Sequence, residues 1–149
     1  MKLNSLIAVA GLALALYIPA SAQNSNDEIT LRSGSGDCAA YVSNDDDSTI
    51  YLWNGEPVAY LASQDIYGFN GKHLGWFIKG VVYDHDGDVV GAVTSRFKTP
   101  QPICSIKSLK SLKPLKSLKE LKPLKPLFHL TWADDVALKR FLLAGKDND

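Results

Sequence analysis

The residues best suited to catalysis or metal binding form two short acidic segments. Residues 84–88 read Asp-His-Asp-Gly-Asp, and residues 45–47 are three consecutive aspartates. Closely spaced carboxylates in a loop can bind calcium, and a carboxylate beside a histidine can perform acid–base catalysis. These segments define an enzyme hypothesis: a metal-dependent or carboxylate-based hydrolase that uses the segment Asp84–Asp88.

The position of residues 84–88 argues against that hypothesis. Asp86 and Gly87 align with Asn-Gly pairs sixteen and thirty-two residues earlier. We therefore expect a turn there, with its carboxylates in solvent, because Asp-Gly and Asn-Gly favour the same tight geometry. For residues 45–47 the simpler interpretation is a solvated loop. Neither His73 nor His129 has a cysteine or histidine at zinc-ligand spacing, so no metal, cofactor or catalytic residue is predicted.

A second chemical feature is a run of lysines at every third position. It comprises Lys107, Lys110, Lys113, Lys116, Lys119, Lys122 and Lys125. Lysines on one edge suit anionic lipid headgroups or an acidic envelope polymer, each contributing about 1 kcal/mol near a charged membrane. Nucleic acid is the less favoured partner, because residues 27–98 carry eleven acids and five bases.

The element that must position these groups is a repeat of sixteen residues. Residues 50–61, 66–77 and 82–93 share an aliphatic residue and a tyrosine, then Asn or Asp, then Gly, then Ala or Gly four residues later. Residues 31–42 are a looser copy. A fixed period with a constant turn residue indicates a repeat architecture. We expect one β-hairpin per copy, with Gly36, Gly55, Gly71 and Gly87 in the turns.

The hairpin hypothesis sorts the side chains onto two surfaces. A type I′ turn at Asn54-Gly55 would place Tyr51 opposite Val58 and Ile50 opposite Ala59. One surface then collects Ile50, Ala59, Leu61 and their equivalents, and the other collects Tyr51, Val58, Tyr60 and theirs. Both surfaces are apolar, so one is expected to line a closed barrel, and the other needs a cover or a ligand. Small residues recur where hairpins would crowd the axis, at Ala40, Ala59, Gly75 and Gly91.

The predicted cover is the segment 105–127, in which leucines and lysines alternate with Ser, Pro or Glu at a period of three. Polyproline II has three residues per turn, so it would place all leucines on one edge and all lysines on another. We expect the leucine edge to pack on the barrel and the lysine edge to face solvent. The alternative is a disordered basic tail. After it, residues 131–143 predict a short helix capped by Thr131.

Four segments are predicted along the chain. Residues 1–22 form a signal peptide, with Lys2, an apolar run of thirteen residues and a cleavage site ending at Ala22. Residues 23–104 form the barrel, 105–127 the ribbon, and 128–149 a short helix and tail, with no membrane-spanning segment in the mature chain. The predicted localisation is periplasmic or secreted. Export permits a disulfide between Cys38 and Cys104, the alternative being two unrelated buried thiols.

Residues 51–61, 66–77 and 83–87 resemble the four-fold β-flower proteins of bacteria. The central motif reads Ile-Tyr-Gly-Phe-Asn-Gly-Lys-His-Leu-Gly-Trp-Phe. The Lys-Pro-Leu ribbon and the segment around Trp132 are similar to that family's C-terminus. The resemblance implies a mainly β fold, a shallow pseudo-four-fold-symmetric antiparallel β-barrel of hairpin repeats with a period-three ribbon and a short C-terminal helix. It implies no activity, and the expected function is an exported, non-enzymatic binding or structural module of the cell envelope.

Overall fold

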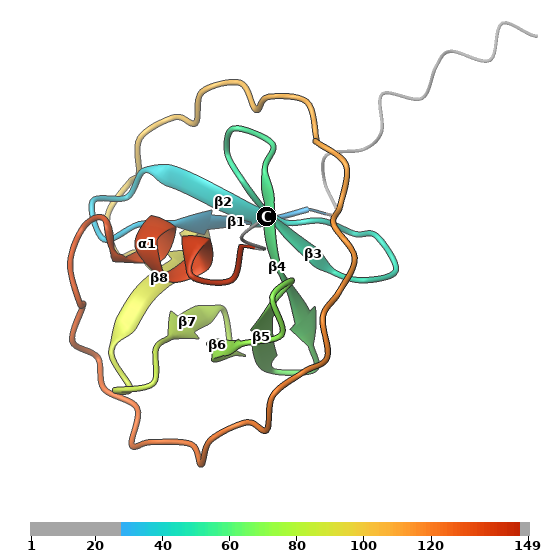
Figure 1. Ribbon diagram of the computed structural model, residues 1–149. Helices are drawn as coiled ribbons and strands as arrows, with labels where there is room; N and C mark the ends of the chain where they lie inside the picture. The colour runs from blue at the N-terminus through green and yellow to red at the C-terminus, as the bar shows by residue number, and fades with distance from the viewer. Residues whose placement is uncertain (1–27, 147–149) are drawn as a thin grey trace, which may run out of the picture.

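Eight antiparallel strands close into a barrel in the computed structural model, which describes residues 28–146 (Figure 1). The predicted signal peptide and the start at Gln23 lie outside the described residues. The strands are β1 (Ile29–Arg32), β2 (Cys38–Val42), β3 (Thr49–Leu52), β4 (Pro57–Ala62), β5 (Asp65–Gly68), β6 (His73–Ile78), β7 (Val81–Tyr83) and β8 (Val89–Val93). Each strand pairs with its neighbour in sequence, and β1 pairs with β8 to close the barrel. A 3-10 turn, η2 (Thr94–Arg96), and one helix, α1 (Ala137–Leu143), follow.

The four hairpins share one turn geometry, which is not the predicted type I′. The glycines at the four turns have φ between 84° and 87°: Gly36, Gly55, Gly71 and Gly87. The φ of Asn54, in contrast, is not positive. A type I′ turn needs positive φ at both central residues. Asn54 instead accepts a hydrogen bond from the backbone N–H of Glu56 through its side-chain oxygen, at 3.1 Å. The prediction of glycine at these turns holds, but the turn type was wrong.

A one-residue bulge in every hairpin changes which side chains face inward. Ile50 pairs with Ala59 as expected, but Tyr51 pairs with Pro57 instead of Val58. Because neighbouring strand residues point to opposite faces, this shift carries Val58 to the inner side. Val58, Leu74 and Val90 therefore lie in the barrel core, not on the aromatic surface where we expected them.

The barrel core is completed by the C-terminal helix, which lies across one mouth of the barrel (Figure 1). Leu138 and Leu142 of α1 are fully buried in the same cluster as Ile50, Ile66 and Val82. The predicted small positions Ala40, Ala59, Gly75 and Gly91 are all buried inside. A Cβ on Gly91 would come within 2.8 Å of Leu138, so small residues are needed to admit the helix.

The helix is shorter than predicted. It begins at Ala137 after Val136, and no side chain caps it. Thr131 is not a cap, because it lies in an extended segment whose carbonyl accepts a hydrogen bond from Val89 at 2.8 Å. That segment adds a parallel bridge between Val89 and Trp132, which keeps residues 131–133 out of the helix. Among residues 28–146, no helix is long and apolar enough to cross a membrane.

Candidate functional site: the ribbon and its leucine rim

Residues 105–127, the ribbon, form an extended segment that encircles the hairpin turns of the barrel (Figure 1). Three backbone hydrogen bonds tie it down at intervals of nine residues. Ser111, Glu120 and, just past the ribbon, His129 donate to the carbonyls of Gly55, Gly71 and Gly87 at 2.9, 2.9 and 2.8 Å. Nine ribbon residues therefore span one sixteen-residue hairpin repeat, and the ribbon is an ordered part of the fold.

The ribbon also explains the turn glycines more fully than backbone conformation does. A Cβ built on Gly55, Gly71 or Gly87 would collide with the carbonyl oxygen of Leu109, Leu118 or Leu127, respectively. Glycine is thus required twice at each turn, for its positive φ and for the approach of a second backbone. The sequence did not predict the second requirement, because the step of nine ribbon residues per hairpin is visible only in the hydrogen bonds of the structure.

The beginning of the ribbon is held by several contacts. Cys104 forms a disulfide with Cys38 of β2, with the two α-carbons 5.5 Å apart. Arg32 donates hydrogen bonds to the carbonyls of Gly36 and Pro102, at 2.7 and 2.9 Å. The indole of Trp53 donates to the carbonyl of Ser105 at 3.0 Å. These contacts fix the ribbon where it leaves the barrel.

The lysine edge of the ribbon faces the barrel, which is the reverse of the prediction. The ammonium groups of Lys107 and Lys116 lie 4.2 Å from the ring centroids of Tyr41 and Tyr60. Lys119 lies 5.1 Å from the ring of Tyr67. A cation over the face of an aromatic ring is attracted by the ring's quadrupole. The outer aromatic surface of the barrel is therefore covered by the ribbon, as expected, but by its lysines instead of its leucines.

Acidic side chains at the strand ends away from the hairpin turns complete the contacts of the lysine edge. Glu28 forms ion pairs with Lys107 and with Lys110, the latter at 2.7 Å. Asp47 pairs with Lys113 and Lys116 at 2.9 and 2.6 Å. Asp45 also pairs with Lys113, at 3.3 Å, so two of the three aspartates at 45–47 bind ribbon lysines. This corrects the expectation of a purely solvated loop.

These ion pairs lower the pKa values of the acids. Burial raises the pKa of Glu28, but hydrogen bonds from Lys107 and Lys110 outweigh it and hold the pKa below its ordinary value. Asp47 has a lowered pKa because Lys116 and Lys113 donate hydrogen bonds to it. Burial raises the pKa of Tyr41 to about 12, so its ring stays neutral under the lysine. The seven lysines, predicted as contacts for an external anion, are directed to partners within the chain.

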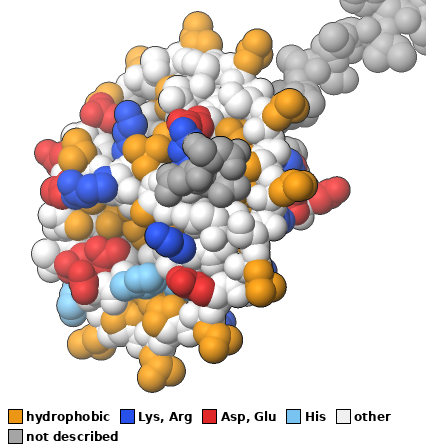
Figure 2. Space-filling model, in the orientation of Figure 1, with side chains coloured by type: hydrophobic (Ala, Val, Ile, Leu, Met, Phe, Trp, Pro, Cys, Tyr) orange, Lys and Arg blue, Asp and Glu red, His pale blue; other side chains and the backbone are white. Residues whose placement is uncertain are grey.

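The leucine edge faces solvent. Ten aliphatic side chains at a period of three, which we call the leucine rim, are 82–99% exposed: Ile103, Ile106, Leu109, Leu112, Leu115, Leu118, Leu121, Leu124, Leu127 and Leu130. Figure 2 shows hydrophobic side chains projecting around the outline of the molecule. The prediction that this edge packs on the barrel is wrong, because the tyrosines and acids of the barrel bind the lysines instead. Single exposed apolar residues are ordinary on a protein surface, but ten in one regular row are not, and they mark this edge as a candidate interaction site.

The buried side chains Asp65 and His73, together with the exposed His85, form a polar cluster that was not predicted. The Nε2 atom of His73 is 3.0 Å from Asp65, and its Nδ1 is 2.9 Å from His85. Burial lowers the pKa of His73, against the opposing effect of Asp65. A neutral His73 that donates to Asp65 must accept its second hydrogen bond from His85. Lys122 of the ribbon binds the other oxygen of Asp65 at 2.9 Å, so the cluster helps to hold the ribbon.

The segment 84–88 serves its own turn. Asp84 accepts hydrogen bonds from the backbone N–H groups of Asp86 and Asp88, at 3.0 and 2.9 Å. Within the part of the chain that the structure describes, no group of three or more His, Cys, Asp or Glu side chains is arranged to hold a metal ion. The carboxylate of Asp84 thus stabilises its own turn by accepting hydrogen bonds from the turn's backbone.

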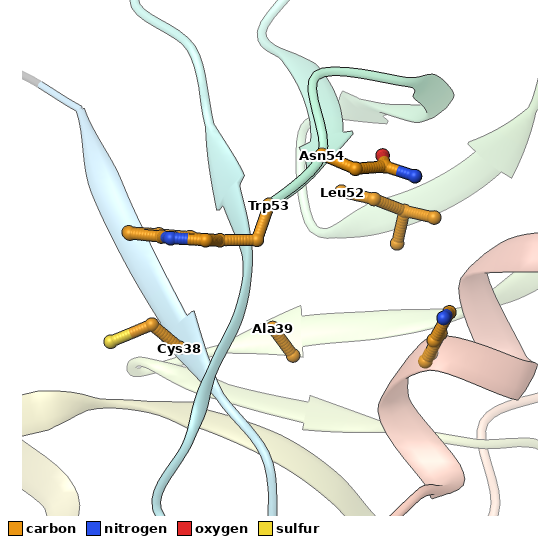
Figure 3. Close-up of a pocket in the computed structure, with 6 residues that line it drawn as sticks. Cys38, Ala39, Leu52, Trp53 and Asn54 are labelled. Atoms are coloured by element: carbon orange, nitrogen blue, oxygen red, sulfur yellow. The ribbon is translucent and has the colours of Figure 1, made fainter. Parts of the chain in front are cut away.

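A hollow of about 260 Å³ lies beside the second hairpin turn, with Trp53 and Cys38 on one side and Leu52 on the other (Figure 3). Ala39, Asn54 and Lys139 complete its lining. Lys139 is its single charged residue, so it holds no pair of groups that could share a proton transfer. The rim, not this hollow, is the candidate functional site.

Fold and ribbon together define a closed eight-stranded barrel of four hairpins encircled by its own C-terminal segment. The chain belongs to the family described as 4-fold beta flower protein, whose family model matches residues 29–142. That range includes the barrel, the ribbon and α1. No curated protein and no solved structure matches the chain.

Proposed function

We propose that this protein is an exported, non-enzymatic binding or structural module of the cell envelope, and that the leucine rim is its contact surface. The observation that carries the proposal is the rim itself. Ten aliphatic side chains stand almost entirely in water, and none is needed for the barrel core. Burying apolar area releases free energy at roughly 25 cal/mol per Å², so contact with an apolar partner would be favourable.

Support for export comes from the first 22 residues and from the cysteine pair. The sequence there has the order of a basic start, an apolar run and a small-residue cleavage site. A disulfide between Cys38 and Cys104 suits an oxidising compartment. Contact with lipid headgroups through the lysines has less support, because the lysine edge is directed to Glu28, Asp47 and Asp65.

The test is fractionation of cells that express the full chain, with mass spectrometry of the exported form. The expected product begins at Gln23 and sediments with the envelope. A rim variant, Leu112→Ser with Leu118→Ser and Leu124→Ser, should move to the soluble exported fraction. Val136→Ser is the matched control, because Val136 is 64% exposed and lies outside the rim. A product that retains Met1, or equal fractionation of the rim variant and wild type, would contradict the proposal.

A further inference from the structure

The leucine rim extends along three of the four sides of the barrel. The segment 101–130, which carries the rim, runs from the first hairpin, where a Cβ on Gly36 would meet Gln101, to the last, where His129 binds Gly87. Between them it touches the turns at Gly55 and Gly71. The exposed aliphatic side chains are therefore spread around the barrel and not gathered on one side (Figure 2).

The spacing of the rim makes it a row of separate projections. Three residues of an extended ribbon with three residues per turn cover about 9 Å. Leu112 and Leu115 are 95% and 90% exposed, so neighbouring leucines do not cover one another. A row of projections with regular gaps fits best against a row with the same spacing. A second copy of this chain has that spacing by identity.

A flat lipid surface fits this arrangement less well. Laid against the edge of the barrel, a bilayer can meet one arc of the rim and leaves the others in water. Immersing the whole rim would also immerse one end of the barrel. Both ends carry exposed charges, with Lys139 and Arg140 beside the helix and Asp46, Lys79 and Arg96 near the opposite connections. Burial of such charges is costly, and among them Arg140 has an ion-pair partner in Asp134.

We propose that the leucine rim packs edge to edge against the rims of further copies of this chain. The inference rests on the proposed function, because it names the partner of the same surface. The formal net charge of the full sequence is +0, and loss of Lys2 with the signal peptide leaves −1, so copies are held apart by almost no net charge. Five of the seven ribbon lysines, which would repel one another across such a contact, are paired with acids of their own chain. Of the other two, Lys119 lies over the Tyr67 ring and Lys125 binds Gln64.

The pseudo-four-fold arrangement predicts more than a dimer. Each nine-residue step of the ribbon presents an equivalent set of leucines, such as 109, 112 and 115 and then 118, 121 and 124. A copy can therefore hold neighbours on different sides at once, and the assembly is expected to extend in the plane of the rim. Each single contact uses a short arc and is expected to be weak.

The test is sedimentation velocity of the purified, disulfide-bonded mature chain over a wide concentration range. The weight-average mass of wild type should rise with concentration to at least about twice that of the monomer. Leu112→Ser with Leu118→Ser and Leu124→Ser should remain monomeric with an unchanged melting temperature, and Val136→Ser should behave as wild type. A wild-type protein that stays monomeric at every concentration would overturn the inference.

A parallel flotation assay with vesicles of zwitterionic and of anionic lipid separates the two proposals. A monomer that floats with vesicles through its rim would overturn self-association and leave the binding module in place. A monomer that binds neither kind of vesicle and still sediments with the envelope through its rim would also overturn self-association alone. If the triple rim variant behaves as wild type both in sedimentation velocity and in cell fractionation, both proposals are overturned.

Discussion

The carbonyl oxygen of Leu118 lies so close to the α-carbon of Gly71 that no side chain fits between them. Two residues further on, Glu120 donates a hydrogen bond of 2.9 Å to the carbonyl of Gly71. The hairpin turn and the ribbon are therefore one packed unit at this point.

This contact predicts that Gly71→Ala is more destabilising than a positive φ alone would make it. Gly80 has a similar φ of 80°, and a Cβ there would lie 2.7 Å from Cγ2 of Val93, whereas a Cβ on Gly71 would lie 2.1 Å from a backbone carbonyl oxygen. Gly80→Ala should cost about 1 kcal/mol of unfolding free energy, and Gly71→Ala at least about 1 kcal/mol more. Guanidinium unfolding measures both. Equal losses would show that the ribbon does not press on the turn.

The inward lysines predict a stability difference between two ribbon positions. Lys107 contacts Glu28 and lies 4.2 Å from the Tyr41 ring, whereas Lys125 binds the side-chain oxygen of Gln64 at 3.0 Å. Lys107→Met should lower the unfolding free energy by about 1–2 kcal/mol. Lys125→Met, the matched control, should lower it by less than about 0.5 kcal/mol. The prediction fails if the two variants melt together.

The outward leucines predict the opposite of what their hydrophobicity suggests. Leu118 is 95% exposed, and Leu138 of α1 is fully buried. Leu118→Ser should leave the melting temperature of the dilute protein unchanged, because no packing is lost. Leu138→Ala should cost about 2–5 kcal/mol through the cavity it leaves. A strong destabilisation by Leu118→Ser would instead indicate a buried leucine edge.

Acid should loosen the ribbon. Burial raises the pKa of Asp65, but hydrogen bonds from Lys122 and His73 outweigh it, and the pKa is lowered; Glu28 behaves in the same way with Lys107 and Lys110. A carboxylate with a lowered folded pKa stabilises the fold above its unfolded pKa. That contribution is lost as pH falls through the folded value, below about pH 4. The melting temperature should therefore fall between pH 5 and pH 3. In the monomeric rim variant, the size of this fall should not depend on protein concentration.

The control for this acid sensitivity is Glu28→Gln. The variant lacks one of the groups that must take up a proton, so its melting temperature should change less over the same pH interval. Wild type and Glu28→Gln with parallel pH profiles would exclude Glu28 as a source of the effect.

The disulfide should contribute strongly, because Cys38 and Cys104 are 66 residues apart in sequence. Closing a loop of that length contributes roughly 4 kcal/mol in the chain-entropy account. The double variant Cys38→Ser with Cys104→Ser should lose about that much in denaturant unfolding. A reducing agent should lower the stability of wild type towards that of the double variant and leave the double variant unchanged. An oxidised wild type no more stable than the double variant would refute the prediction.

The hairpin repeat could be predicted from the sequence because its signals are local. Asn-Gly or Asp-Gly at a fixed period located the turns, and the small residues Ala59, Gly75 and Gly91 located the barrel axis. The bulge beside Pro57 could not be predicted, since an Asn-Gly pair suits both a two-residue turn and a longer loop with glycine in the left-handed region. That single residue decided whether Val58 faced inward.

The orientation of the ribbon could not be predicted from hydrophobicity. A period of three defines a leucine edge and a lysine edge, and a rule that buries apolar groups selects the leucines. The decisive partners lie elsewhere in the chain: the rings of Tyr41 and Tyr60, and the acids Glu28 and Asp47. Two signals pointed to them, the tyrosine that recurs in the repeats and the excess of acids in residues 27–98. Asp65 and His73 gave no such signal, because only the pairing of β5 with β6 brings them together.

The steps of nine and sixteen residues make the ribbon sensitive to changes in its length. One residue inserted after Leu115 would turn every later position by about a third of a turn, so leucines and lysines downstream would leave their edges. Three inserted residues would restore the edges but move Leu118 away from Gly71. Nine inserted residues would restore both the edges and the contacts with the turns, provided that the barrel also gained one sixteen-residue hairpin repeat. Length variants that fold should therefore gain or lose a ribbon step and a hairpin as a pair.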